Sequence, residues 1–172
     1  MGQLVTDVLI DRLKEEDKER YVEVLVESYA QYEKHYPSKE AWQDYISDIR
    51  NSVNHPHSAE IFVAKKGEDI LGGLQLFIGS GNAYNRPELE RDSTIVRLLG
   101  IHPKARGLGI AKKLLDKSVE FARARGDEYL YLHSTDMMEA AIKLYIRFGF
   151  VRDERKDFQK NNFLVKAFKY KL

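Results

Sequence analysis

The chain has 172 residues and carries 28 Lys and Arg against 27 Asp and Glu, a formal net charge of +1. This length favours a single domain over residues 1–172, and the balanced charge gives no basis for non-specific nucleic-acid binding. The absence of cysteine excludes a disulfide framework, a thiolate metal site and a cysteine nucleophile, and no apolar run approaches the length of a membrane span.

The first half of the chain predicts a strand, two helices and a hairpin. The strand covers Thr6–Leu13, and an amphipathic helix follows over Glu15–Tyr32. Ser38 is an N-cap for a second helix, because aromatic and apolar residues recur after it at one-face spacing. Two strands, Glu60–Lys66 and Ile70–Gly79, are joined by a tight turn.

The second half alternates strands and helices. Gly79–Asp92 is rich in Gly, Asn and Pro and predicts a loop. Thr94–Ile101 is an apolar strand, and the helix after it ends near Gly126. The remaining elements are a strand, a short helix and two closing strands: Tyr129–His133, Met137–Phe148, Phe150–Lys156 and Phe163–Lys171.

The turn between the central strand and its helix indicates an anion site. A helix start offers main-chain N–H groups without intrahelical partners and a partial positive charge. Gly107 and Gly109 remove side chains that would keep a phosphate away from those donors. A P-loop is excluded because Lys112-Lys113 is followed by Leu114 instead of Ser or Thr, and a dinucleotide fingerprint would need a third glycine at position 112.

Two blocks of sequence carry a family resemblance. The first is Leu99-Gly100-Ile101-His102-Pro103 followed by Arg106-x-x-Gly109-x-Ala111, and the second is Ala141-x-x-x-Tyr145-x-x-x-Gly149-Phe150. With this order and separation the chain resembles the GNAT-type N-acetyltransferases. The resemblance covers roughly the C-terminal half, and the N-terminal half agrees in the order of its elements.

The resemblance implies a mixed α+β fold: a central, mostly antiparallel sheet splayed between its fourth and fifth strands and flanked by helices. It implies that acetyl-CoA is the cosubstrate, that no metal takes part, and that a primary amine attacks the acetyl group directly in a ternary complex. By resemblance, pantetheine pairs with the main chain of Leu99 and Ile101. The pyrophosphate then lies over the main chain of the turn, formed by Arg106, Gly107, Leu108, Gly109, Ile110 and Ala111.

Tyr145 stands where the family places a tyrosine near the sulfur of CoA. Its hydroxyl would act as a general acid by protonating the departing thiolate. The alternative is a core aromatic residue that packs with Leu144 and Phe148.

The chain departs from the family pattern at the general base. Many members have a glutamate where this chain has Arg97, and a cation does not act as a base at neutral pH. The amine proton would leave through water, through His133, whose intrinsic pKa suits the task, or through Glu27. Arg97 would bind a substrate carboxylate or be a salt-bridged surface residue.

A second departure is Met138, which stands where an asparagine often bonds the pantetheine arm; Asp136 or Ser134 would substitute. The resemblance implies that the acceptor is bound by aromatic residues, among them Tyr29, Tyr32 and Tyr84, together with Arg97.

The acceptor is a small-molecule or peptide amine, and neither choice follows from the residues. A homodimer is compatible with the resemblance, and we expect a cytoplasmic location. Two other classes remain open: a non-catalytic acyl-CoA-binding or sensing module of the same fold, and an anion-binding interaction domain that does not use CoA.

Overall fold

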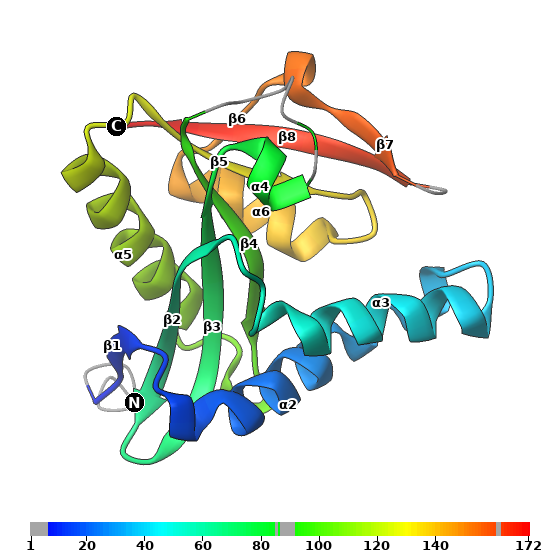
Figure 1. The fold of residues 1–172 in the computed structure, drawn as a ribbon, viewed down its shortest axis with the longest axis vertical. Helices are drawn as coiled ribbons and strands as arrows, with labels where there is room; N and C mark the ends of the chain where they lie inside the picture. Colours follow the sequence, from blue (N-terminus) through cyan, green and yellow to red (C-terminus); the bar gives the residue numbers. More distant parts are fainter. Residues whose placement is uncertain (1–6, 85, 87–91, 161–162) are drawn as a thin grey trace. The chain divides into compact units, whose positions relative to one another are not determined.

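The computed structural model describes residues 7–84, 86, 92–160 and 163–172 (Figure 1). The chain forms two compact units, the first made of Met1–Gln75 and Leu98–Lys117 and the second of Leu76–Arg97 and Ser118–Leu172. A single domain over the whole chain stays a prediction. No helix in the described ranges combines the length and the apolar character needed to cross a bilayer.

The first unit contains the predicted hairpin. Strand β2 (Ser58–Lys66) turns at Gly67 into β3 (Asp69–Ile78), and the φ of Gly67 is +61°, as a hairpin turn with glycine in its first central position requires. Strand β1 (Leu9–Arg12) pairs antiparallel with β2. It confirms the predicted first strand, whose Thr6 lies outside the described residues.

The two predicted helices also form in this unit. The first comprises a short 3₁₀ helix followed by α2 (Lys18–Tyr29), and a second 3₁₀ helix, η2 (Ala30–His35), continues it. Helix α3 (Lys39–Ser52) begins as expected at Ser38, whose Oγ accepts a hydrogen bond of 3.0 Å from the N–H of Ala41. Helices α2 and α3 pack against each other (Figure 1).

The second unit is organised around β8 (Phe163–Lys171). Strand β5 (Tyr129–Ser134), the short edge strand β6 (Val151–Arg152) and β7 (Phe158–Lys160) all pair antiparallel with β8. Strand β4 (Thr94–Ile101) pairs in parallel with β5, after the crossover through α5 (Ile110–Arg125) that parallel strands need. The mixed, mostly antiparallel sheet with flanking helices confirms the expected fold class.

The pairing of β4 with β5 is short. In the described residues its register covers Ile95 opposite Tyr131 and Val96 opposite Leu132. Leu98, two residues later, has a φ of +54°, in the left-handed region that interrupts a regular strand. The regular backbone of β4 is therefore interrupted soon after the residues that pair with β5, while the splay expected between the fourth and fifth strands stays a prediction.

The prediction of a loop over Gly79–Asp92 is wrong in part. Within Gly79–Asp92 the structure has a short helix, α4 (Ser80–Tyr84), while residues 85 and 87–91 lie outside the described part of the chain. The N–H of Ala83 donates to the carbonyl of Gly79 at 3.1 Å, and Ala83 packs with Phe77, Ile95 and Tyr131. Tertiary packing here outweighs the weak helix propensity of Gly and Asn.

The strand predicted over Phe150–Lys156 is also wrong beyond Arg152. After β6 the chain enters a 3₁₀ helix, η4 (Glu154–Lys156). The carboxylate of Asp153, which is almost fully buried, accepts from Arg155 at 3.1 Å, and this draws the chain out of the sheet direction. Helix α6 (Glu139–Phe148) ends at Gly149 as predicted, where φ is +127°.

Candidate functional site

The turn between β4 and α5 in the first unit has the geometry of an anion site. It begins with η3 (Pro103–Ala105), capped by His102. Gly107 and Gly109 have φ of +81° and +77°, and a Cβ at either position would meet no heavy atom within 4 Å. The space above this main chain is therefore open, and the first turn of α5 supplies N–H donors beside it.

Arg106 is anchored inside the first unit. Its Nη2 donates a hydrogen bond of 2.9 Å to the carbonyl of Ser28, at the C-terminal end of α2, where the helix dipole favours a cation. The residue is exposed, and a guanidinium has five N–H donors, so others remain for an anion. Ile110 is buried and holds the start of α5 against the core, while Leu108 and Ala111 are half-buried.

The main chain of β4 is already bonded to α2. The hydroxyl of Tyr29 donates to the carbonyl of Leu99 at 3.0 Å, and the N–H of Ile101 donates to Oγ of Ser28 at 3.1 Å. A carbonyl oxygen accepts two hydrogen bonds, so Leu99 retains capacity for a ligand, whereas the single N–H of Ile101 is engaged. Pairing of these two residues with pantetheine stays a prediction.

Glu27, one of the alternatives for the general base, is held by His102. Its Oε2 lies 2.6 Å from Nε2 of His102, whose Nδ1 accepts from the N–H of Lys104 at 3.1 Å. The second bond leaves the ring proton on Nε2, which therefore donates to the carboxylate.

The acceptor candidates of the first unit form an aromatic group at the ends of α2 and α3. The ring centroids of Tyr29 and Tyr32 are 5.7 Å apart, and Tyr36 stacks on Tyr45 at 5.2 Å. Burial raises the pKa of Tyr32, an effect that the charge of Arg106 partly offsets. Next to this group is an open groove of about 550 Å³, lined in part by Tyr36, Ser38 and Trp42.

In the second unit, Tyr145 lies on α6 and is almost fully buried. Its ring meets that of Phe150 edge-on, with centroids 6.1 Å apart. This contact agrees with a packing role and leaves the proposed proton donation untested.

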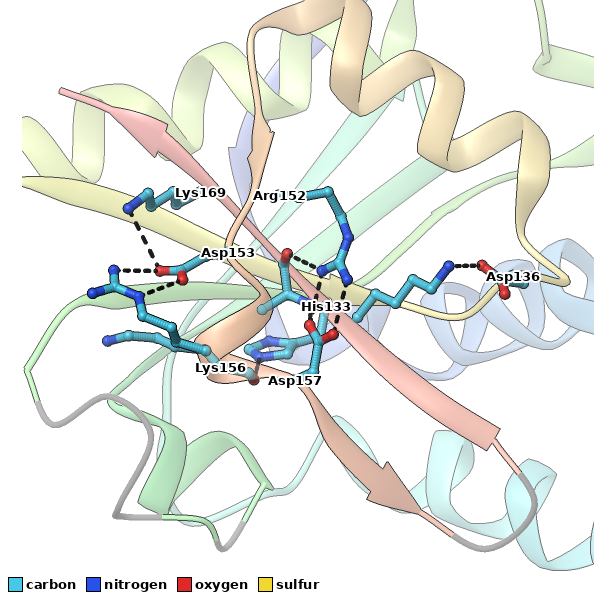
Figure 2. Close-up of polar contacts among 10 residues, drawn as sticks. His133, Asp136, Arg152, Asp153, Lys156, Asp157 and Lys169 are labelled. Atoms are coloured by element: carbon cyan, nitrogen blue, oxygen red, sulfur yellow. Dashed lines mark hydrogen bonds and ion pairs between the residues drawn. The ribbon is translucent and has the colours of Figure 1, made fainter.

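His133 is held in one orientation by η4. Its Nε2 lies 3.2 Å from the carbonyl of Lys156, and because a carbonyl only accepts, this nitrogen carries the proton (Figure 2). Burial lowers the pKa of His133 to about 4; Arg97 and Lys156 add to the lowering, while the bond to the Lys156 carbonyl and the charge of Asp157 oppose it. The imidazole is therefore neutral at pH 7 and a weak base.

A two-bond ion pair fixes η4 beside His133. The two terminal nitrogens of Arg152, Nη1 and Nη2, donate to the carboxylate of Asp157 at 2.8 Å each (Figure 2), and this carboxylate also accepts from the N–H of Ala167 at 2.7 Å. Asp153 is the second charged anchor of this region, with Arg155 at 3.1 Å and Lys169 at 3.6 Å. Arg152 and Asp157 were missed from the sequence, where the only sign of them is a pair of opposite charges beside apolar strand positions.

Tyr84, Arg97 and His133 are brought together by the second unit. The ring of Tyr84 is 4.7 Å from that of His133 and 5.0 Å from Cζ of Arg97. Burial raises the pKa of Tyr84 to about 12, with Arg97 acting against the increase, so its hydroxyl stays protonated at pH 7.

The end of β5 carries buried polar atoms without partners. Among the described residues these include Nδ1 of His133, Oγ of Ser134 and Oγ1 of Thr135. Asp136, in contrast, is exposed and lies 2.6 Å from Nζ of Lys166 (Figure 2). Of the two substitutes considered for the missing asparagine, Ser134 has a buried hydroxyl without a partner in the described residues, and Asp136 has an exposed carboxylate that is already paired.

The fold, with its glycine turn before α5, defines a protein of the acetyltransferase class. A model of the Acetyltransferase (GNAT) family matches residues 10–150, and the chain belongs to this family.

The similar proteins differ in length and in degree of identity. Mouse (Mus musculus) N-acetyltransferase 8F1 is 26% identical over 121 residues, which cover 66% of this chain and 52% of that protein. Mouse N-acetyltransferase 8B is 30% identical over 108 residues, or 63% of this chain and 44% of that protein. The matched part thus spans about half the length of these relatives.

Solved structures share the fold along nearly the whole chain. The PaiA N-acetyltransferase of Thermoplasma acidophilum, crystallised in complex with coenzyme A, has a TM-score of 0.71 and 17% identity, covering 96% of this chain and 99% of that one. A GNAT-family acetyltransferase of Staphylococcus aureus Mu50 has a TM-score of 0.70 and 20% identity, with coverage of 96% and 99%.

Proposed function

We propose that this protein is an acetyl-CoA-dependent N-acetyltransferase that transfers the acetyl group to a primary amine in a ternary complex. The observation that carries the proposal is the open turn at Gly107 and Gly109, before α5, in a chain of the GNAT family. The names of the mouse relatives and the coenzyme A complex of the Thermoplasma protein support it.

The turn fits the diphosphate of CoA. Its glycines leave open space over main-chain donors, and Arg106 adds a positive charge that is exposed to solvent. We assign the diphosphate to the main chain of Arg106–Ala111 and the pantetheine arm to β4 at Leu99 and Ile101. The unpartnered hydroxyl of Ser134 would take the place of the missing asparagine.

When bound, acetyl-CoA supplies a thioester whose C–S bond breaks as the C–N bond to the acceptor forms. Tyr145 donates its hydroxyl proton to the departing sulfur and regains a proton from water. The amine loses its proton to water. His133 is a poor base for this step because its pKa of about 4 is far below that of an amine, and its role is better described as accepting a hydrogen bond from the acceptor.

Each unit, taken by itself, has candidate residues for contact with the acceptor. In the first unit these are Tyr29 and Tyr32, which belong to the aromatic group of α2 and α3. In the second they are Tyr84 and Arg97, which contact each other.

Calorimetric titration with acetyl-CoA, CoA and adenosine diphosphate tests the cosubstrate assignment. We expect binding of acetyl-CoA and CoA that is tighter than binding of adenosine diphosphate, since only the first two contain the pantetheine arm. An amine screen by thiol release then tests turnover. The chain has no cysteine, so a thiol reagent detects CoA alone.

The alternative is a non-catalytic acyl-CoA-binding module of the same fold. It is favoured by Arg97, which stands where many members have a glutamate base. Binding of acetyl-CoA without turnover of any amine would support this alternative, and the absence of binding by the folded protein would contradict both.

A further inference from the structure

Arg97 is a cation held between aromatic rings. Its Nη1 donates to the carbonyl of Ala83 at 3.0 Å, at the end of α4. Its Cζ lies 5.0 Å from the ring centre of Tyr84 and 5.6 Å from that of Phe77. A guanidinium packed on rings keeps its remaining N–H groups in its own plane, where they match the two oxygens of a carboxylate.

The charge of Arg97 lacks an acidic partner within residues 7–84, 86, 92–160 and 163–172. Arg152, a second partly buried arginine of this region, differs in this respect because it forms two bonds of 2.8 Å to Asp157. A third, Arg86, lies over the ring of Phe158 and donates to the carbonyl of Gln159 at 3.2 Å.

Since the described residues offer this partly buried cation, Arg97, no counter-ion, an anionic ligand would pair with a charge that they leave unpaired. Of its five donors, one bonds to the carbonyl of Ala83 and another to the side chain of Tyr84, so the others are open to a ligand.

His133, which packs against the same ring of Tyr84, supplies a hydrogen-bond acceptor that complements the donors of Arg97. Its Nε2 is the donor to Lys156, which leaves Nδ1 as an acceptor. That atom is buried and has no partner in the described residues. The ring centroid of His133 lies 4.7 Å from that of Tyr84, so this tyrosine packs against both the guanidinium of Arg97 and the imidazole ring.

The charged groups around His133 keep this nitrogen an acceptor. Arg97 and Lys156 both disfavour the imidazolium, as does burial, and Asp157 opposes them. Asp157 is itself neutralised by Arg152. The site therefore presents a cationic donor and a neutral acceptor, the reverse of the donor–acceptor pattern of an amino acid.

We propose that the acceptor is an amino acid, whose carboxylate pairs with Arg97 while an N–H of its amino group donates to Nδ1 of His133. This inference rests on the proposed function and names its substrate class. Tyr84 and Phe158, whose ring is 5.4 Å from that of His133, form the aromatic wall beside the two groups. A neutral alkylamine satisfies only the acceptor nitrogen and leaves the cation unpaired.

The test compares matched acceptors at saturating acetyl-CoA. Each common L-amino acid is assayed by thiol release beside its amide, which retains the amino group and side chain but has no negative charge. For the preferred side chains we expect kcat/KM to be about 10- to 100-fold higher for the acid, the range of a charge-assisted hydrogen-bond pair. Rates are compared at equal concentrations of unprotonated amine, because an amide lowers the pKa of its amino group.

Arg97→Gln should abolish the preference for an amino acid over its amide by raising KM for the acid, with KM for acetyl-CoA unchanged. Arg97→Lys should retain part of this preference. Arg123→Gln, at an exposed position of α5, is the matched control and should keep the full preference. Circular dichroism checks the fold, and the wild-type comparison stands even where a variant does not fold.

The failures of the two proposals are distinguishable. If amides or alkylamines are acetylated as well as the acids, or better, the amino-acid inference is overturned and the transferase proposal stands. If acetyl-CoA binds but no amine is turned over, the transferase proposal fails. The inference is then decided by calorimetry of L-amino acids and their amides on the CoA-saturated protein, where equal or undetectable binding contradicts it.

Discussion

Arg152 and Asp157 join the two ends of η4 through a pair of hydrogen bonds of 2.8 Å each. Between these residues lies Lys156, whose carbonyl accepts from His133. The ion pair is therefore connected by one short segment of main chain to the imidazole that we place in the acceptor site (Figure 2).

Replacing Asp157 by Asn tests how much the ion pair with Arg152 stabilises the fold. The change removes the counter-charge of a partly buried Arg152, and we expect a loss of roughly 2–4 kcal/mol in the free energy of unfolding. Urea denaturation measures it. Glu139→Gln, which breaks the exposed pair of Glu139 with Lys143, is the matched control and should cost less than about 1 kcal/mol. Equal losses in the two variants would contradict the role given to Asp157.

The free energy of unfolding should decrease as the pH is lowered, because His133 has a lower pKa in the folded protein than in the unfolded chain. Its pKa is about 4 in the folded protein and near 6.5 when unfolded, so between these values the unfolded chain binds the additional proton. The free energy of unfolding should then decrease by roughly 3 kcal/mol as pH falls from about 6.5 to about 4, from this residue alone. His133→Gln should flatten that part of the curve, and His35→Gln, at an exposed position, should not.

Below about pH 4, the pH dependence of stability comes from carboxylates such as Asp157. Burial raises the pKa of Asp157, but the bonds from Arg152 and the Ala167 N–H outweigh it, and the net effect is a lowered pKa. Its contribution to stability is complete above the unfolded pKa near 3.9 and is lost as pH falls through the lower folded value. Denaturation of wild type and Asp157→Asn below pH 4 should give different slopes; parallel curves would rule out this contribution.

Tyr145→Phe should lower kcat by roughly 100-fold or more, the usual contribution of a general acid, with little change in acetyl-CoA affinity. The ring contact with Phe150 is retained in the variant, so the fold should persist. Tyr170→Phe is the matched control, since Tyr170 also contacts Phe150 and its hydroxyl has no assigned chemistry. Unchanged kcat with all good acceptors would remove the acid role of Tyr145.

Gly109→Glu should weaken CoA binding by placing a negative side chain in the open space above the turn. The φ of +77° also strains any side chain there, and this strain must be separated from the effect on the ligand. Gly126→Glu provides the separation, because Gly126 has a φ of +86° and equally open surroundings at the other end of α5. Calorimetry should show weakened affinity in Gly109→Glu alone; a similar decrease in both variants would mean that the turn is not the diphosphate site.

Much of the fold could be predicted because local pattern and packing agree. The bounds predicted for the central strand, Thr94–Ile101, are those of β4. Ser38 caps α3, and Gly149 ends α6, because these residue types satisfy helix-end groups whatever the tertiary context.

The elements and contacts that could not be predicted depend largely on interactions between residues distant in sequence. Helix α4 contains Ser, Gly, Asn and Tyr, which are weak helix formers, beside Ala83, whose burial no local pattern records. The chain leaves the sheet at Asp153, whose carboxylate pairs with the distant Lys169 on β8 as well as with the nearby Arg155. Likewise, the serine and tyrosine that end α2 gave no sign that their hydroxyls would bond to β4.

The left-handed residue Leu98 makes β4 a strand that changes neighbours along its length. Before it, Ile95 and Val96 follow the register of β5; after it, Leu99 and Ile101 bond to hydroxyls from α2. An insertion or deletion within β4 would reverse the facing of side chains on one side of Leu98 and not on the other. Changes in length among natural variants should therefore fall in turns such as the one at Gly67, and β4 should keep its number of residues.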